Sequence, residues 1–206
     1  RAGEDRPTAA GSDALMRHLP GVAALALALG ACATASTPPP PSDPLAGIPE
    51  QRLAVSYIDV SEAFPAATGT FIDKRHSQDL QAATRGYLNT RLAAAGGPSS
   101  ARATILEATV MEERRPAGSS LGAPFRNTPD ATLKGRVEVK LVIVGANGTE
   151  LGFASAKVER ARSLPNVSTV PEREQMAQDM IREMVQELDR ALTSSVKQNL
   201  SQYLTL

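Results

Sequence analysis

Cysteine and histidine are nearly absent from this sequence, which contains one cysteine, Cys32, and two histidines, His18 and His76. An internal disulfide needs two cysteines and therefore cannot form. A structural zinc site is built mostly from four Cys or His ligands, and a Cys/His nucleophile needs both side chains close together. The composition argues against both kinds of site, and we expect no metal and no other cofactor. The folded part must be stabilised by its apolar core.

Aromatic residues and net charge are also scarce. Phe, Trp and Tyr make up 3% of the chain, tryptophan is missing, and 22 basic residues balance 22 acidic ones. Proteins that bind nucleic acid carry clustered Lys and Arg, and so do surface helices that charge holds on anionic lipid. We therefore expect no nucleic-acid partner and no membrane attachment through a basic helix.

The apolar stretch Leu19–Leu29 is too short to cross a membrane as a helix. Its eleven residues would span roughly 16 Å, against about 30 Å for the hydrocarbon core. It follows the basic Met16-Arg17-His18 and ends in Leu29-Gly30-Ala31-Cys32, with small residues directly before the cysteine. This pattern is typical of a bacterial lipoprotein signal peptide that is cleaved before Cys32, whose sulfur then takes the diacylglycerol. The alternative is a buried core segment with an incidental cysteine.

The signal divides the chain. The segment before Met16 is polar, and we expect Met16 to be the true start. Residues 1–31 are then upstream residues and signal peptide, residues 32–50 are the lipidated N-terminus and a proline-rich tether, and residues 51–206 form a single domain.

The tether contains the sequence Thr-Pro-Pro-Pro-Pro at Thr37–Pro41 and has almost nothing to bury. It should be a partly polyproline-II spacer that reaches roughly 50 Å when extended. In the common enterobacterial sorting rule, an Asp directly after the lipidated cysteine favours the inner membrane. Ala33 stands at that position, so we expect a periplasm-facing anchor in the outer membrane.

The domain is predicted to begin with a strand and a helix. Arg52–Val60 alternates as a strand, with Tyr57 on its apolar face. An apolar stripe with helical spacing follows at Asp79–Ala95, with Ser77 as N-cap. Gly96-Gly97-Pro98 should end this helix, because glycine accepts the left-handed cap and proline cannot continue a helix.

A second strand is predicted at Ala101–Arg114. Strict alternation places Leu106, Ala108 and Val110 on one face of this strand and Ile105 on the other. The 116–129 loop that follows is long for a compact domain, and such loops tend to be mobile or functional.

The clearest pattern is a β-hairpin. Leu133–Val144 alternates between apolar residues and charged ones, the turn Gly145-Ala146-Asn147-Gly148 accepts the positive φ of a tight hairpin, and Thr149–Arg160 returns. The apolar face of the first strand carries Val137, Val139, Leu141 and Ile143.

A long helix ends the chain. Thr169 and Glu172 fit a capping box, and an apolar stripe continues from Pro171 to Tyr203. Either the whole stripe packs on the sheet, or the last two turns extend past the sheet and contact a partner.

The order strand, helix, three strands, helix predicts an α+β fold. The economical solution is a small, mostly antiparallel sheet of about four strands with both helices on one face. The charged face of the hairpin then stays open.

Little in the domain points to catalysis. His76 lies beside two cations and is expected to be an exposed surface residue. The string Gly-x-Ser-x-Gly at 118–122 lacks the strand, helix and downstream histidine of a nucleophile elbow. Glu112 and Glu113 are adjacent in a strand and should point to opposite faces at a solvated strand end. No catalytic residue is predicted, and the ligand-binding residues stay unidentified.

A lipobox at Leu29–Cys32, a proline-rich spacer and this order of elements resemble the small periplasmic α/β lipoproteins of Gram-negative envelopes. Two such groups are the lipopolysaccharide-assembly lipoprotein and the auxiliary lipoprotein of lipid-transport ABC systems. Only Leu29–Cys32 matches at the level of a motif, so no family binding residue is carried over. The resemblance implies a non-enzymatic accessory or scaffold subunit, with an envelope protein as partner.

Two other hypotheses stay open. One is a lipid or small-ligand carrier with a pocket between helices and sheet, and the other is a hydrolase. A packed helix–sheet interior favours the scaffold, whereas a cavity of several hundred Å³ favours the carrier. The sequence names neither the partner nor the oligomeric state.

Overall fold

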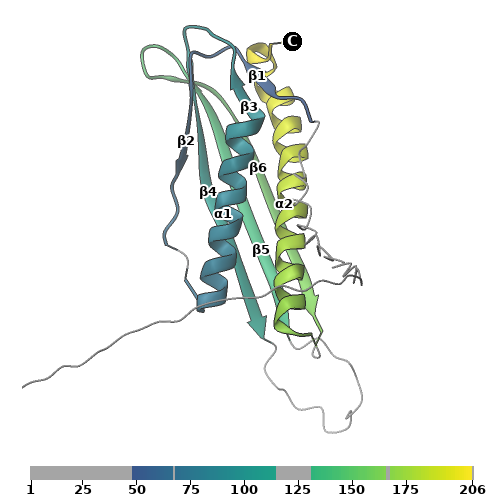
Figure 1. Ribbon diagram of the computed structural model, residues 1–206. Helices are drawn as coiled ribbons and strands as arrows, with labels where there is room; N and C mark the ends of the chain where they lie inside the picture. The colour runs from purple at the N-terminus through teal and green to yellow at the C-terminus, as the bar shows by residue number, and fades with distance from the viewer. Residues whose placement is uncertain (1–47, 67, 115–130, 166–167, 206) are drawn as a thin grey trace, which may run out of the picture. The chain divides into compact units, whose positions relative to one another are not determined.

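A four-stranded sheet with two helices on one face forms the core of the described chain (Figure 1). The computed structural model describes residues 48–66, 68–114, 131–165 and 168–205. The elements are β1 (Gln51–Leu53), β2 (Ile58–Glu62), α1 (Phe71–Arg91), β3 (Leu92–Ala94), β4 (Ser100–Arg114), β5 (Ala131–Val144), β6 (Glu150–Leu164), α2 (Val170–Asn199) and a 3₁₀ turn (Ser201–Tyr203). The predicted fold class is confirmed.

The main sheet has the strand order β2-β4-β5-β6. β2 runs parallel to β4, and the other two pairs are antiparallel. The hairpin of β5 and β6 is confirmed, including its turn, where Gly148 has a φ of 81°. The return strand continues to Leu164, four residues beyond the predicted end.

The inner face of the sheet meets the helices in a packed apolar core. The four β5 side chains predicted to face the core, Val137, Val139, Leu141 and Ile143, are fully buried. The outer face carries charged side chains that pair across strands, such as Lys134 with Glu113 at 2.7 Å and Arg136 with Glu159 at 3.8 Å. One face therefore contacts the core and the other faces solvent, as predicted.

The predicted first strand is two short strands in different sheets. The N–H of Val55 donates to the carbonyl of Leu53 over 2.8 Å, and this tight turn breaks the strand. β1 pairs in parallel with β3, a strand that periodicity did not reveal. The break also turns Tyr57 away from the core, and its side chain is 60% exposed.

The first helix begins eight residues before its predicted start. Thr70 is the N-cap, and it forms a capping box in which its hydroxyl accepts from the N–H of Asp73 and the Asp73 carboxylate accepts from the N–H of Thr70. Ser77, the predicted N-cap, is buried within the helix instead. The helix ends at Arg91, because the chain turns directly into β3. The glycines predicted to cap it, Gly96 and Gly97, lie beyond β3 and lead into β4.

A β-bulge in β4 corrects the predicted faces of this strand. The register with β5 shifts between Ile105 and Glu107, so one extra residue is inserted at Leu106. Ile105 and Ala108 therefore share the core face, and Leu106 is only half-buried.

Side chains of α1 cover the part of the β4 edge that β2 does not reach. The carboxylate of Asp73 accepts from the N–H of Glu112 over 2.8 Å, the hydroxyl of Ser77 accepts from the N–H of Val110 over 3.0 Å, and Gln81 donates to the carbonyl of Ala108 over 3.2 Å. These three helix residues recur every four positions and replace the hydrogen bonds of a neighbouring strand.

The second helix begins with the predicted capping box of Thr169 and Glu172. Its last turns pack on the sheet, because Val196 and Leu200 are fully buried and the hydroxyl of Ser195 accepts from the N–H of Ser155 over 3.1 Å. Of the two alternatives for the last turns of this helix, packing on the sheet is confirmed, and the stripe does not extend past the sheet near Leu200. Within the described ranges, neither helix combines the length and the apolar character that a membrane span requires.

Candidate functional site

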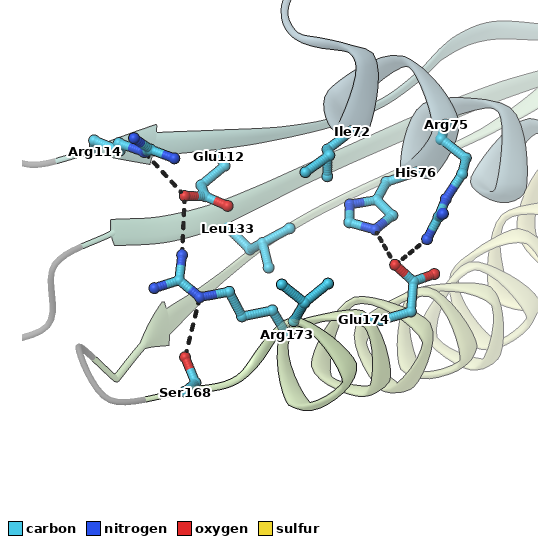
Figure 2. A pocket seen from close by; sticks show the side chains of 10 residues that line it. Ile72, Arg75, His76, Glu112, Arg114, Leu133, Ser168, Arg173 and Glu174 are labelled. Carbon is cyan, nitrogen blue, oxygen red and sulfur yellow. Dashed lines mark hydrogen bonds and ion pairs between the residues drawn. The ribbon is translucent and has the colours of Figure 1, made fainter.

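A hollow of about 400 Å³ lies where the N-terminal ends of α1 and α2 meet the ends of β4 and β5 (Figure 2). Both helices start here because both capping boxes lie at this end of the sheet. The first turns of the helices and the last residues of β4 therefore supply most of its lining. The helix–sheet interior beside it is packed, with apolar side chains that are at most 6% exposed.

One group of charges centres on Glu174 in the first turns of α2. Its carboxylate pairs with Arg75 and lies 3.1 Å from Nε2 of His76, both in α1. The hydrogen bond with His76 holds the pKa of Glu174 below its ordinary value; burial opposes this effect and the charge of Arg75 adds to it. The pair joins the two helices at the rim of the hollow.

The prediction for His76 is wrong, since this side chain is only 4% exposed. Because α1 begins at Phe71, His76 lies one helical turn before Leu80, on the face that packs against the rest of the protein. The neighbouring cation Arg75 extends toward the same Glu174 carboxylate as His76 (Figure 2).

A second group centres on Glu112 at the end of β4. Its carboxylate accepts from Arg173 over 3.3 Å and from Arg114 over 3.4 Å, and Nε of Arg173 donates to the hydroxyl of Ser168 over 3.2 Å. Glu112 and Glu113 do point to opposite faces, as predicted. However, the Glu112 side chain is only 17% exposed, so the prediction of a solvated strand end is wrong for this residue.

The backbone of Glu112 is held in place by Asp73. Burial alone would raise the pKa of Asp73, but hydrogen bonds from the N–H of Glu112 and from the N–H and hydroxyl of Thr70 outweigh burial, and the pKa is lowered. Asp73 is therefore charged at neutral pH, and it connects the start of α1 to the end of β4.

Apolar side chains complete the hollow. Leu133 of β5 is buried at 2% exposure, whereas Ile72 and Val170 are 50% and 77% exposed. These two residues are the second residue of α1 and the first of α2. The hollow thus combines a buried apolar wall with apolar residues at its rim.

The charged side chains of the hollow are paired with one another. Each of the two carboxylates is shared between two cationic or basic partners, so three guanidinium groups and one imidazole face two glutamates. Among the residues that the structure describes, no cluster of three His, Cys, Asp or Glu side chains could hold a metal ion.

A second polar cluster lies near the other end of the helices. Arg91 of α1 pairs with Asp189 of α2, and Gln51 of β1 donates to the hydroxyl of Thr193 over 2.5 Å. Two buried atoms of this cluster, Oε1 of Gln51 and Nη1 of Arg91, have no hydrogen-bond partner in the described part of the protein. Gln51 thus joins β1 to α2, and the Arg91–Asp189 pair joins the two helices.

The site residues predicted from sequence are Leu29, Gly30, Ala31 and Cys32, and they lie outside the described residues, as do the 118–122 string and the 116–129 loop. The hollow itself was not predicted. Its charged residues come from α1, β4 and α2 and show no common motif. The one available signal was Thr70-Phe71-Ile72-Asp73, which has the same capping-box spacing as Thr169–Glu172.

No protein-family model matches the sequence, and no curated protein matches it either. Among solved structures, the chain is similar to a minor lipoprotein from Acinetobacter baumannii, with 18% identity, a TM-score of 0.36, and coverage of 68% of this chain and 94% of the other. Rare lipoprotein B from Shewanella oneidensis is 14% identical with a TM-score of 0.36, and the match covers 69% of this chain and 95% of the other. A lipoprotein from Neisseria meningitidis is 12% identical with a TM-score of 0.28, and the match covers 67% of this chain and 99% of the other.

All three neighbours are bacterial lipoproteins by name. With identities below 25% and TM-scores below 0.5, these likenesses assign neither a family nor a function to this chain. The resemblance to the lipopolysaccharide-assembly group stays a prediction.

Proposed function

We propose that this protein is a non-enzymatic lipoprotein of the bacterial envelope, anchored through acyl chains on Cys32 and acting as an accessory or scaffold subunit. The anchor is supported by the basic start, the short apolar run and the Leu29-Gly30-Ala31-Cys32 ending. Ala33 after the cysteine favours the outer membrane, and the role would lie in envelope assembly or lipid transport.

The observation that carries the proposal is the separation between the entry of the tether and the hollow. The tether reaches the domain at Ile48, just before β1, and Gln51 of β1 contacts Thr193 near the end of α2. The hollow lies beside Glu174 in the first turns of α2, roughly 30 Å away at 1.5 Å per residue. An anchored module with this arrangement presents its charged hollow away from the point of attachment.

The packed interior supports a scaffold over a carrier with a pocket between helices and sheet. Apolar residues on the core faces of β4, β5 and both helices are almost completely buried. A carrier remains the second candidate because the hollow has the volume of a small ligand site. Its binding site would then lie at the end of the sheet, at the hollow.

The anchor is tested by mass spectrometry of the N-terminal peptide from native cells. We expect a processed peptide that begins at an acylated Cys32, and we expect Cys32→Ser to remain unprocessed or to fractionate with soluble periplasmic protein. An unmodified thiol at Cys32, or wild-type membrane fractionation of the variant, would contradict the proposal.

The partner is tested by photocrosslinking in the same cells. A photoreactive residue at Ile72, on the rim of the hollow, should give one discrete crosslinked envelope protein. The same residue at Lys157, on the charged outer face of β6, serves as the matched control. Equal crosslinking from both positions, or none from Ile72, would argue against a partner at the hollow.

A further inference from the structure

We propose that the hollow at the N-terminal ends of α1 and α2 is a binding site for a small amphiphilic anion, a single carboxylate or phosphate attached to a short apolar chain. This inference goes beyond the proposed scaffold role and rests on the second candidate, the small-ligand carrier, because it names the chemistry that the hollow would recognise. It depends on the residues of the hollow and not on how the protein is anchored.

The anionic group is inferred from incomplete charge compensation. Among the described residues that line the hollow, Arg75, Arg114 and Arg173 carry positive charge, whereas Glu112 and Glu174 carry negative charge. Both carboxylates are already shared between two partners, so an incoming anion can contact the arginines without displacing either carboxylate. Guanidinium groups are well suited to this role because they bind carboxylate and phosphate oxygens through two parallel hydrogen bonds.

Arg173 is positioned before any ligand arrives. Arg173 is held by Ser168 at 3.2 Å and by Glu112 at 3.3 Å, and its side chain is 25% exposed. Arg114 contacts the same carboxylate from the rim, where it is 82% exposed. Figure 2 shows the two guanidinium groups converging on Glu112 from α2 and from β4. Preorganisation of this kind lowers the entropic cost of binding.

The apolar part of the ligand is inferred from the remaining walls. Leu133 forms a buried apolar surface, and Ile72 and Val170 are exposed at the rim as far as the described residues show. A short chain that crosses the rim would remove these side chains from water.

The volume limits the size of the ligand. About 400 Å³ accommodates on the order of a dozen non-hydrogen atoms at roughly 30 Å³ for each water-sized group. Octanoate fits this limit, and so does hexyl phosphate, whereas a lipid with several acyl chains does not.

The test is isothermal titration calorimetry on the full mature chain carrying Cys32→Ser, which removes the need for detergent. The probes are octanoate and hexyl phosphate, with octanol as the uncharged control and acetate as the control without a chain. We expect one octanoate or hexyl phosphate per chain, and affinities for octanol and acetate that are weaker by about tenfold or more. The preferred probe then separates a carboxylate ligand from a phosphate ligand.

Two variants in the hollow and one control variant outside it test whether octanoate binds at the hollow. Arg173→Gln and Arg114→Gln should each weaken octanoate binding by about tenfold, the effect of losing one charge-assisted hydrogen bond. Arg114 is exposed at the rim, so its replacement tests the site even where Arg173→Gln disturbs folding. Arg102→Gln is the matched control. Arg102 also lies in β4, but it is 63% exposed and its ion-pair partner, Asp59, is 4.0 Å away, so this variant should bind octanoate as tightly as the protein without the substitution.

Three results would overturn the inference: equal affinity for octanoate and octanol, equal losses in Arg102→Gln and Arg114→Gln, or no binding of either anion. None of them would affect the test of acylation at Cys32. Conversely, an unmodified Cys32 in native cells would remove the anchor and leave the calorimetric result standing.

Discussion

Nε of Arg91, at the end of α1, donates to Oδ1 of Asp189 in α2 across 2.6 Å, and both side chains are more than nine-tenths buried. Tyr87, one turn earlier in α1, directs its hydroxyl at the same carboxylate over 3.4 Å. Burial, with the charge of Asp189 adding to it, raises the pKa of Tyr87 far above its ordinary value, so the phenol stays protonated. A single carboxylate thus satisfies two buried groups of the other helix.

Removing this carboxylate should be severely destabilising. Asp189→Ala leaves the Arg91 guanidinium buried without a counter-charge, and we expect a loss of about 3–5 kcal/mol in the free energy of unfolding. Urea unfolding of the full chain at pH 7 measures this loss.

An exposed pair provides the control for Asp189. Asp59 is 57% exposed and lies 4.0 Å from Arg102, so Asp59→Ala should cost no more than about 0.5 kcal/mol. Similar losses of unfolding free energy in Asp59→Ala and Asp189→Ala would show that the buried Arg91–Asp189 pair stabilises the protein no more than an exposed pair does.

The hydroxyl of Ser77 should matter because it replaces a strand at the edge of the sheet. It accepts from the N–H of Val110 over 3.0 Å and donates to the carbonyl of the same residue over 3.2 Å, and both residues are fully buried. Ser77→Ala leaves both backbone groups without a partner, so we expect a loss of about 1–3 kcal/mol in urea unfolding. Ser163→Ala, at an exposed position of β6, should change stability by less than about 0.5 kcal/mol.

Asp73 should make the fold sensitive to acid. Its pKa is lower in the folded protein than its unfolded value near 3.9, because backbone and hydroxyl hydrogen bonds stabilise the carboxylate. This stabilisation is fully present above the unfolded pKa and is lost as the pH falls through the lower folded-state pKa. The urea midpoint of the wild type should therefore fall from about pH 4 downward.

Asp73→Asn separates this effect from general acid denaturation. The variant keeps an acceptor oxygen for the N–H of Glu112 but has no carboxyl to protonate, so its midpoint should fall less steeply with pH than that of the wild type. Glu174, whose pKa is lowered mainly by its hydrogen bond with His76, should act in the same direction. Identical acid profiles for Asp73→Asn and the wild type would assign the acid sensitivity to other groups.

Much of the fold follows from the sequence where local pattern and burial agree. β5 alternates strictly, and the capping box of Thr169 and Glu172 is followed by a continuous apolar stripe in α2. The same capping-box spacing at Thr70 and Asp73 marks the true start of α1. It was missed because the first turns of α1 are mostly polar or charged, and Ser77 then suggested a later N-cap.

The remaining features depend on contacts between segments far apart in sequence. The bulge at Leu106 reverses the faces of β4, and alternation alone cannot locate an inserted residue. The hollow joins Arg75, Glu112 and Glu174, from α1, β4 and α2, and no local spacing connects them. His76 could be recognised as buried only after the start of α1 was known.

Two glycines should respond to alanine with opposite signs, because only one of them has room for a methyl group. Gly135 faces the core from β5, and a Cβ there would press on the Met184 side chain and approach Cε of Met180 to 3.1 Å. Gly86 lies on the exposed side of α1, and a Cβ there meets no atom within 4 Å. Gly135→Ala should destabilise the protein by about 1–3 kcal/mol through overpacking.

Gly86→Ala should instead stabilise it by about 0.5–1 kcal/mol, because alanine favours the helix and restricts the unfolded chain. The difference in sign, read from urea midpoints of the two variants, is more informative than either value. If Gly135→Ala is neutral, Met180 and Met184 adjust to the methyl group without cost, and the core between β5 and α2 is packed less tightly than its burial indicates.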